Sequence, residues 1–252
     1  MSMQSVLTAL RVLEEVSACQ PAGLSDLSRR LNLPKSTVQR CLRTLAEAGW
    51  LRSEERELTR WMLTPRAFSL GSLVLDDRNL RDIAMKHLSE LQAATLEAVH
   101  LTVPDGDEVV LVERLDSAHH LRTFQPIGRR MPLHASSNGK AFLASLSDQE
   151  IERYLAQPLA QVTANTITEV AVLREQLAEI RLRGYAENHE ELNNGVFAVG
   201  AAICPADGRS VGALSVSAPA LRMTAELMRQ YGELVHAAAA AIAADLPKRL
   251  RG

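Results

Sequence analysis

Polar and basic side chains gather in one short segment near the start of the chain. Residues 29–43 contain five Arg and Lys residues and no Asp or Glu. Six side chains of this segment can bond to nucleic acid: Lys35, Ser36, Thr37, Gln39, Arg40 and Arg43. Lys, Ser and Thr suit phosphate oxygens, whereas Gln pairs with adenine and Arg with guanine in the major groove. These residue types therefore predict contact with double-stranded DNA.

Three short helices are expected to position these side chains. Apolar residues at helical spacing predict a first helix: Val6, Leu10, Leu13 and Val16. Ser25 is expected to cap a second helix, which a tight turn at 31–33 follows. Pro34 then opens a third helix, 34–48, which Gly49 ends. Two short helices with a tight turn between them predict a helix-turn-helix, although an ordinary helical hairpin with a solvated face has the same spacing.

Two short strands are predicted directly after the third helix. They cover residues 50–52 and 60–63, and a polar tip, 53–59, connects them. A hairpin in this place is typical of a wing, whose tip touches the DNA backbone or the minor groove. Here residues 53–57 are Ser-Glu-Glu-Arg-Glu. Whether this tip contacts DNA stays open, because phosphate repels its acidic side chains.

The rest of the chain alternates helices with strands. Helices are expected over 80–94, from 140 onward, and over 148–156, 169–183 and 223–245. Strands are expected over 98–103, 108–115, 121–125, 184–188, 197–204 and 210–217. This order predicts an α+β domain of about 170 residues, which is large enough for its own hydrophobic core.

Composition and charge narrow the class of protein. The 252 residues are 46% hydrophobic and 23% charged, which excludes collagen, a disordered chain and a small disulfide scaffold. No uncharged apolar run reaches about 18 residues and no signal peptide opens the chain, so we expect a cytoplasmic protein with no membrane partner. The net charge of −2 divides into +3 for residues 1–66 and −5 for residues 67–252. The positive part coincides with the predicted helix-turn-helix.

No catalytic, metal or cofactor site is expected. The candidates for acyl transfer are His134, Ser136, His189 and Glu190. No serine lies in a GxSxG motif, and no third group is placed to orient a histidine. His119 and His120 are adjacent and have no carboxylate four residues on, which argues against zinc. The three cysteines are far apart and form no CxxC motif.

Four motifs resemble those of one known family. Residues 33–40 with 45–51 resemble the winged helix-turn-helix of IclR-type transcriptional regulators. Residues 131–144, 184–195 and 212–219 resemble motifs of that family's effector domain. The chain is identified as a member because these motifs occur in the right order over nearly its whole length. The resemblance implies a DNA-binding domain over 1–66, linker helices over 67–95 and a GAF-like effector-binding domain over 96–252.

The resemblance also implies an effector pocket. Its residues would be Ser137, Asn138, Asn188, Ala198, Ser215 and Ser217. Asn188 stands where many members have an acid, and Ala198 where several have cysteine, which implies a neutral pocket rich in hydroxyl and amide groups. Ser215 and Ser217 share one face of a strand, although small residues there would also suit a tightly packed sheet. A small organic acid or an aromatic metabolite is the expected effector. Residues 128–130, Gly-Arg-Arg, are expected to form a solvated loop that could attract an anion.

The sequence thus predicts a ligand-responsive, DNA-binding transcriptional regulator and not an enzyme. Its expected partners are operator DNA, a small-molecule effector and further copies of the chain, as a homodimer or homotetramer, because one short helix contacts too few base pairs. The N-terminal helix and helix 80–94 are the expected dimer surfaces. The alternative is a small-molecule enzyme or metabolite-binding module with a basic N-terminal appendage.

Overall fold

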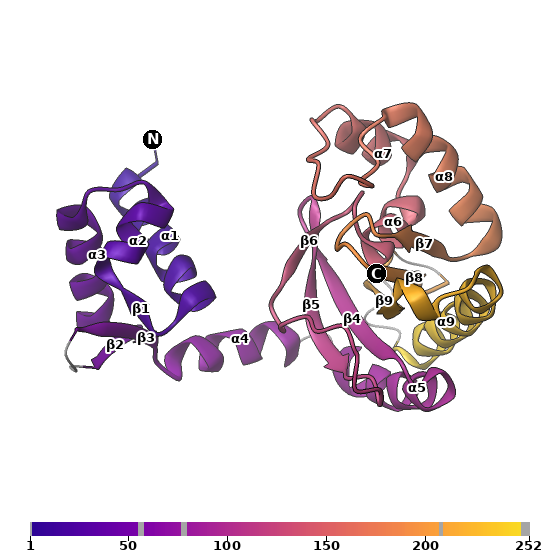
Figure 1. Ribbon diagram of the computed structural model, residues 1–252, viewed down its shortest axis with the longest axis horizontal. Coiled ribbons are helices and arrows are strands. Elements are labelled where there is room, and N and C mark those ends of the chain that lie inside the picture. Colours follow the sequence, from indigo (N-terminus) through magenta and orange to yellow (C-terminus); the bar gives the residue numbers. More distant parts are fainter. Residues whose placement is uncertain (1, 55–57, 77–79, 207–208, 248–252) are drawn as a thin grey trace. The chain divides into compact units, whose positions relative to one another are not determined.

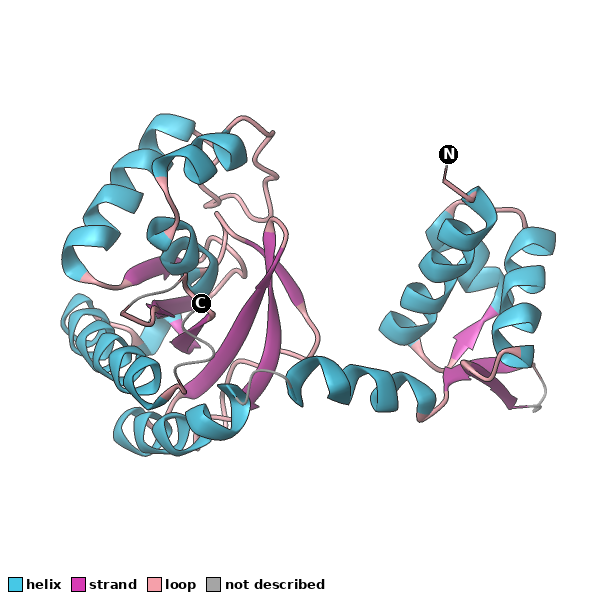
Figure 2. Cartoon of the chain, turned by 180° about the vertical axis from the view of Figure 1, so that it is seen from behind, coloured by secondary structure: helices cyan, strands magenta, loops and turns pink. Residues whose placement is uncertain are grey.

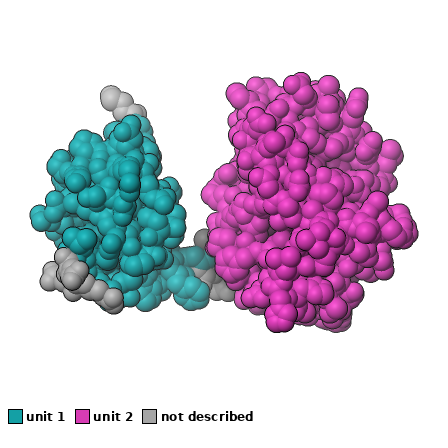
Figure 3. Space-filling view, viewed as in Figure 1, with its two compact units in different colours: residues 1–77 teal, residues 78–252 magenta. Residues whose placement is uncertain are grey.

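The structure, a computed structural model, describes residues 2–54, 58–76, 80–206 and 209–247. The chain forms two compact units, Met1–Asp77 and Arg78–Gly252 (Figure 3). Helix α4 (Arg66–Asp76) belongs to the first unit and helix α5 (Leu80–Thr95) to the second, so the expected linker range 67–95 is divided between them. Among the described helices, none combines the length and the hydropathy that crossing a bilayer requires.

Three helices and a small sheet precede α4 in the first unit (Figures 1 and 2). The helices are α1 (Gln4–Cys19), α2 (Leu24–Leu31) and α3 (Lys35–Glu47). The sheet has the antiparallel order β1 (Ala22–Gly23), β3 (Arg60–Leu63), β2 (Leu51–Glu54). Asn32, with a φ of 51°, ends α2 in the left-handed conformation, and Gly49, with a φ of 79°, follows α3. The unit is a winged helix-turn-helix, as predicted.

Three details of the first unit differ from the prediction. Ser25 does not cap α2, because the helix begins at Leu24 with Gly23 as its N-cap, and no side-chain cap bonds to it among the described residues. Val6 and Leu10 are about half exposed, whereas Val12 and Val16 reach the core. Since α1 has apolar residues on more than one face, their spacing selects no single buried face. The two-residue strand β1 was not expected.

A six-stranded antiparallel sheet is the centre of the second unit. Its strand order is β6-β5-β4-β9-β8-β7. The strands are β4 (Ala98–Asp105), β5 (Glu108–Leu115), β6 (Arg130–Pro132), β7 (Ala186–His189), β8 (Val196–Ile203) and β9 (Gly212–Pro219). β4 and β9 are far apart in the sequence but pair directly, with Ala98 opposite Ser217. The topology thus brings distant segments together on one sheet face.

Helices cover both faces of this sheet (Figures 1 and 2). The helices that follow α5 are α6 (Ser137–Ser145), α7 (Asp148–Leu155), α8 (Val170–Arg183), the short 3₁₀ helix η1 (Ala220–Arg222) and α9 (Ala225–Asp245). α5 and α9 share one apolar cluster with the sheet, which includes Leu88 and Val216. α6, α7 and α8 share another, which includes Leu143 and Leu173. Because neighbouring residues of a strand point to opposite faces, Ser215 and Ser217 are directed away from the cluster that holds Val216.

The strand predicted over 121–125 does not form. These residues are a loop in which Leu121 and Phe124 are exposed, whereas Thr123 and Gln125 are buried. The apolar side chains are therefore exposed and the polar ones buried, which is the opposite of what a strand packed on the core would show. The strand that pairs with β5 at this edge of the sheet is β6 instead, with Met131 opposite Val109.

Helix α6 begins at Ser137, three residues before the predicted start. Ser136 caps it, since its Oγ accepts a hydrogen bond from the Gly139 backbone N–H at 3.0 Å. The first turn of α6 lies close against Gly200 of β8, where an added Cβ would meet Asn138 Oδ1 and the Ser137 carbonyl carbon at 2.9 Å each. The glycine thus lets this helix end approach the sheet.

Candidate functional site

Helix α3 presents the predicted DNA-binding side chains on its outer face. Lys35, Ser36, Gln39, Arg40 and Arg43 are exposed, and Thr37 is half-buried. The opposite face is anchored in the core by Val38, Cys41, Leu42 and Leu45. The structure therefore places all six residues away from the buried face of α3, which packs into the core of the first unit.

The cations of this face have no acidic partner in the described part of the chain. No carboxylate there lies within ion-pair distance of Lys35, Arg40 or Arg43. On α2, by contrast, Arg29 pairs with Asp26 at 2.5 Å and Arg30 with Glu15 at 3.1 Å. The positive charge of α3 is therefore available to an external polyanion. The wing strands form as predicted, but tip residues 55–57 lie outside the described residues.

In the second unit, cross-strand register brings the predicted pocket residues together. Across β7, β8 and β9, Asn188 lies opposite Ala198, and Ala198 lies opposite Ser217. In the neighbouring row, Ser215 lies opposite Gly200 on one side and His100 of β4 on the other. Directly opposed residues of a sheet have neighbouring side chains, so small and polar groups share one patch.

A cavity of about 40 Å³ lies over this patch. All six predicted residues line it, with the first turn of α6 supplying Ser137 and Asn138. Further lining residues are His100, Gln125, Ser136, Leu192, Asn193 and Val196. A larger hollow of about 680 Å³ elsewhere in this unit is lined by none of the predicted residues.

The polar groups of the cavity are only partly satisfied within the chain. Asn188 Nδ2 donates to the Ala135 carbonyl at 2.7 Å, and the hydroxyls of Ser217 and Thr123 lie 2.9 Å apart. Asn138 Oδ1 is fully buried and has no hydrogen-bond partner among the described residues. A buried polar atom without a partner is unfavourable, so a ligand with a hydrogen-bond donor would satisfy it.

His100 is a lining residue that the sequence did not reveal. It is 6% exposed, and burial, followed by the charge of Arg114, lowers its pKa to about 4. Its imidazole is therefore neutral at neutral pH and has both a donor and an acceptor. The only sequence signal was a polar residue within the apolar run that forms β4. Gln125 was not predicted to line the cavity, because the sequence indicated only a strand over 121–125.

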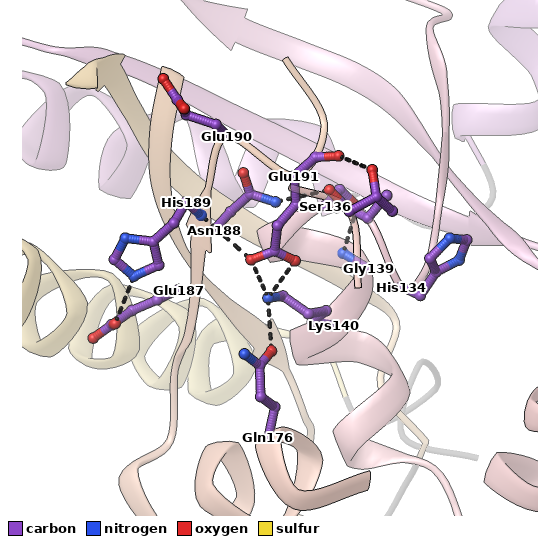
Figure 4. A network of polar contacts seen from close by, with 12 residues as sticks. His134, Ser136, Gly139, Lys140, Gln176, Glu187, Asn188, His189, Glu190 and Glu191 are labelled. Atoms are coloured by element: carbon purple, nitrogen blue, oxygen red, sulfur yellow. Dashed lines mark hydrogen bonds and ion pairs between the residues drawn. The ribbon is translucent and has the colours of Figure 1, made fainter. Parts of the chain in front are cut away.

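Lys140 and Glu191 form a buried ion pair (Figure 4). Lys140 Nζ of α6 is 2.7 Å from both carboxylate oxygens of Glu191 and 3.0 Å from Gln176 Oε1 of α8. Burial lowers the pKa of Lys140, and the carboxylate of Glu191 opposes this shift. The pair joins α6 to the segment with the lining residues Leu192 and Asn193.

The residues considered for acyl transfer are not assembled into a site. His134 lies 2.7 Å from Tyr154 Oη and 2.9 Å from the Ala160 carbonyl. Ser136 caps α6, and His189 Nε2 lies 3.1 Å from Glu187 Oε2 on its own strand. Within the described ranges, no group of three His, Cys, Asp or Glu residues is placed to hold a metal ion.

The first unit is a winged helix-turn-helix in which the cations of α3 have no acidic partner among the described residues. The second is an α+β unit with a small cavity that polar side chains line in part. Together they define a DNA-binding regulator with a ligand-binding domain. Two family models match the chain: the IclR helix-turn-helix domain over residues 5–55, and the bacterial transcriptional regulator IclR C-terminal domain over residues 72–244. The chain belongs to the IclR family of bacterial transcriptional regulators.

Similar proteins are known over nearly the whole length. The chain is 33% identical to the HTH-type transcriptional regulator KdgR of Escherichia coli (strain K12) over 249 residues, which are 97% of this chain and 93% of that protein. It is 33% identical to the transcriptional repressor IclR of the same strain over 241 residues, 94% and 88% of the two chains. These relatives are transcriptional regulators and not enzymes, so the regulator is favoured over an enzyme with a basic appendage.

A solved structure resembles both units of the chain. An IclR homologue from Microbacterium hydrocarbonoxydans, complexed with 4-hydroxybenzoate, has a TM-score of 0.78 and 29% sequence identity, and the match covers 96% of this chain and 98% of that one. The fold thus agrees with the family shown by the sequence models: a DNA-binding domain and a C-terminal effector-binding domain.

Proposed function

We propose that α3 lies in the major groove of operator DNA. Lys35, Ser36 and Thr37 bind phosphates, and Gln39, Arg40 and Arg43 contact base edges. The observation that supports this most directly is the exposed face of α3, whose three cations have no acid among the described residues. Each phosphate that they neutralise releases counterions, so the affinity depends steeply on salt. The site of action is the cytoplasm, where this DNA is.

A second copy of the chain completes the DNA-binding surface. One helix contacts only a few base pairs, and a symmetric dimer doubles the site. Helix α1 supports this assembly because its residues Val6, Leu7 and Leu10, and Met3 just before it, expose apolar side chains. The other expected surface, helix 80–94, gains no such support, since the apolar face of α5 packs into its own domain. We therefore assign the dimer contact to α1; a tetramer would need further surfaces.

The cavity of the second unit binds the effector, a small organic acid or an aromatic metabolite. Six small or polar residues support this role, because they line one cavity although five of them come from three separate motifs and the sixth, Ala198, from β8. At about 40 Å³ the cavity has room for only a few non-hydrogen atoms. An aromatic ring, as in the ligand of the Microbacterium relative, is larger than this space, so the lining residues would have to move apart to admit it.

Fluorescence anisotropy of the full chain tests the DNA-binding part. The probes are a labelled duplex from the region upstream of its own coding sequence and a shuffled duplex of equal length and composition. We expect the upstream duplex to bind about a thousandfold more tightly, with an affinity that falls as salt rises. Equal affinity for both duplexes at every salt concentration would contradict operator recognition.

A further inference from the structure

Beside the cavity lies a cation to which the proposed function assigns no role. Arg129 precedes β6 and is half-buried. Its guanidinium donates one hydrogen bond to Gln125 Oε1 and another, of 3.0 Å, to Asn193 Oδ1. Gln125 and Asn193 both line the cavity. The guanidinium is therefore held at the edge of the cavity by two neutral side chains.

The adjacent residue, Arg130, lies in a different environment from Arg129. Arg130 is exposed and forms ion pairs with Asp105 at 2.7 Å and Glu108 at 2.6 Å. Arg129 is more buried, yet no acid of the described chain lies within ion-pair distance of it. Burial lowers the pKa of Arg129, and no carboxylate opposes the shift. A partly buried charge is normally paired, so this one lacks a counterion.

The side-chain amides of Gln125 and Asn193 supply further hydrogen-bond donors beside Arg129. Their oxygens accept hydrogen bonds from Arg129, which leaves the Nε2 of Gln125 and the Nδ2 of Asn193 as donors. No acceptor within the described chain bonds to either nitrogen. A guanidinium and two amide N–H₂ groups form a cluster of donors, and a carboxylate, which only accepts, matches it.

We propose that Arg129, with Gln125 and Asn193, binds the carboxylate of the effector at the edge of the cavity and so selects anionic over neutral ligands. This inference rests on the proposed function, because it takes the cavity as the effector site. Arg129 is thus a specificity-determining residue. Of the segment 128–130, for which a solvated loop that could attract an anion is expected, Gly128 and Arg130 are exposed and Arg129 is half-buried. The proposal assigns the anion-binding role to Arg129.

Calorimetric titration of the full chain with matched acids and amides tests this role. The probes are lactate with lactamide and 4-hydroxybenzoate with 4-hydroxybenzamide. In the wild type we expect the acid of a pair to bind more tightly than its amide. Arg129→Gln should lower the affinity for the acid about ten- to hundredfold and leave that for the amide unchanged. Arg129→Lys, which keeps the charge, should retain part of the affinity.

Arg130→Gln is the matched control, because it removes one positive charge from the adjacent residue and should change neither affinity. An Arg129→Gln protein that binds the acid as tightly as the wild type overturns the inference. Equal losses for acid and amide also overturn it, since they indicate that Arg129 only shapes the cavity. If the wild type binds neither member of either pair, the sensing part of the proposed function fails together with this inference.

Discussion

At the residue scale, we expect the face of α3 to divide DNA recognition between phosphates and base edges. Gln39→Ala and Arg40→Ala should each weaken operator binding by about 1–3 kcal/mol and relax the preference for one base pair. Lys35→Ala should weaken binding to every duplex alike and reduce the salt slope by about one. Anisotropy with operators mutated at single positions measures both effects. Equal losses for all three variants on every duplex would contradict the division.

His100 makes the stability of the second unit depend on pH. Its pKa is about 4 in the folded protein and about 6.5 in the unfolded chain, so the unfolded state binds more protons between these values. The stabilisation is complete above pH 6.5 and is lost as the pH falls toward 4, by up to about 3 kcal/mol. His134, whose pKa burial also lowers, adds a loss of the same sign.

Urea unfolding between pH 4 and pH 8 measures this contribution. His100→Asn should lose less free energy of unfolding than the wild type between pH 6.5 and pH 4. His120→Asn, which replaces an exposed histidine, should keep the pH dependence of the wild type. An unchanged pH dependence in His100→Asn would show that its imidazole is not buried as described.

At the element scale, the ion pair of Lys140 and Glu191 fixes α6 to the segment that follows β7. Both side chains are almost completely buried, at 1% and 4% exposure. Lys140→Met should therefore lower the free energy of unfolding by about 3–5 kcal/mol, because it leaves the carboxylate of Glu191 buried and unpaired. Denaturant unfolding measures the loss.

The double variant Lys140→Met with Glu191→Leu separates this cause from simple loss of packing. It removes both charges, so it should be more stable than Lys140→Met alone. Arg174→Met, which breaks an exposed pair with Glu152, should cost less than about 1 kcal/mol. A double variant no more stable than Lys140→Met would contradict the account of an unpaired charge.

Most elements could be predicted because their signals are local. Helix α3 has apolar residues at helical spacing between Pro34 and Gly49, and its predicted and observed bounds agree to one residue. Ser215 and Ser217 alternate with buried apolar residues of β9, so their common face also follows from the sequence. The motifs of the C-terminal domain pointed to six residues that line one cavity.

The remaining features depend on tertiary contacts. Thr123 and Gln125 are buried because they meet Ser217 and the cavity, whereas the sequence around them has the alternation of a strand. His100 reaches the cavity only because β4 pairs with β9, more than 100 residues later in the chain. The sequence indicated that residues 128–130 could attract an anion, but it did not place Arg129 beside the cavity, since Asn193 is distant in sequence. The spacing of apolar residues along the chain does not indicate which distant residues become neighbours in the fold.

At the scale of the whole molecule, an effector regulates DNA binding only if it binds two arrangements of the protein with different affinities. A tenfold change in operator affinity requires a tenfold difference between them, about 1.4 kcal/mol. The cavity is lined by residues from β4, α6, β7, β8 and β9, among others, so a ligand there contacts segments from much of the second unit.

Operator affinity with and without ligand tests the central claim most directly. Anisotropy would be measured for the wild type, Ser217→Leu and Ser217→Ala, with the tightest-binding acid of the panel as ligand. Leu at position 217 fills the cavity, whereas Ala removes only a hydroxyl. The account predicts that the ligand changes the operator affinity of the wild type, and that Ser217→Leu binds the operator normally but no longer responds. A Ser217→Leu protein that responds like the wild type would contradict it.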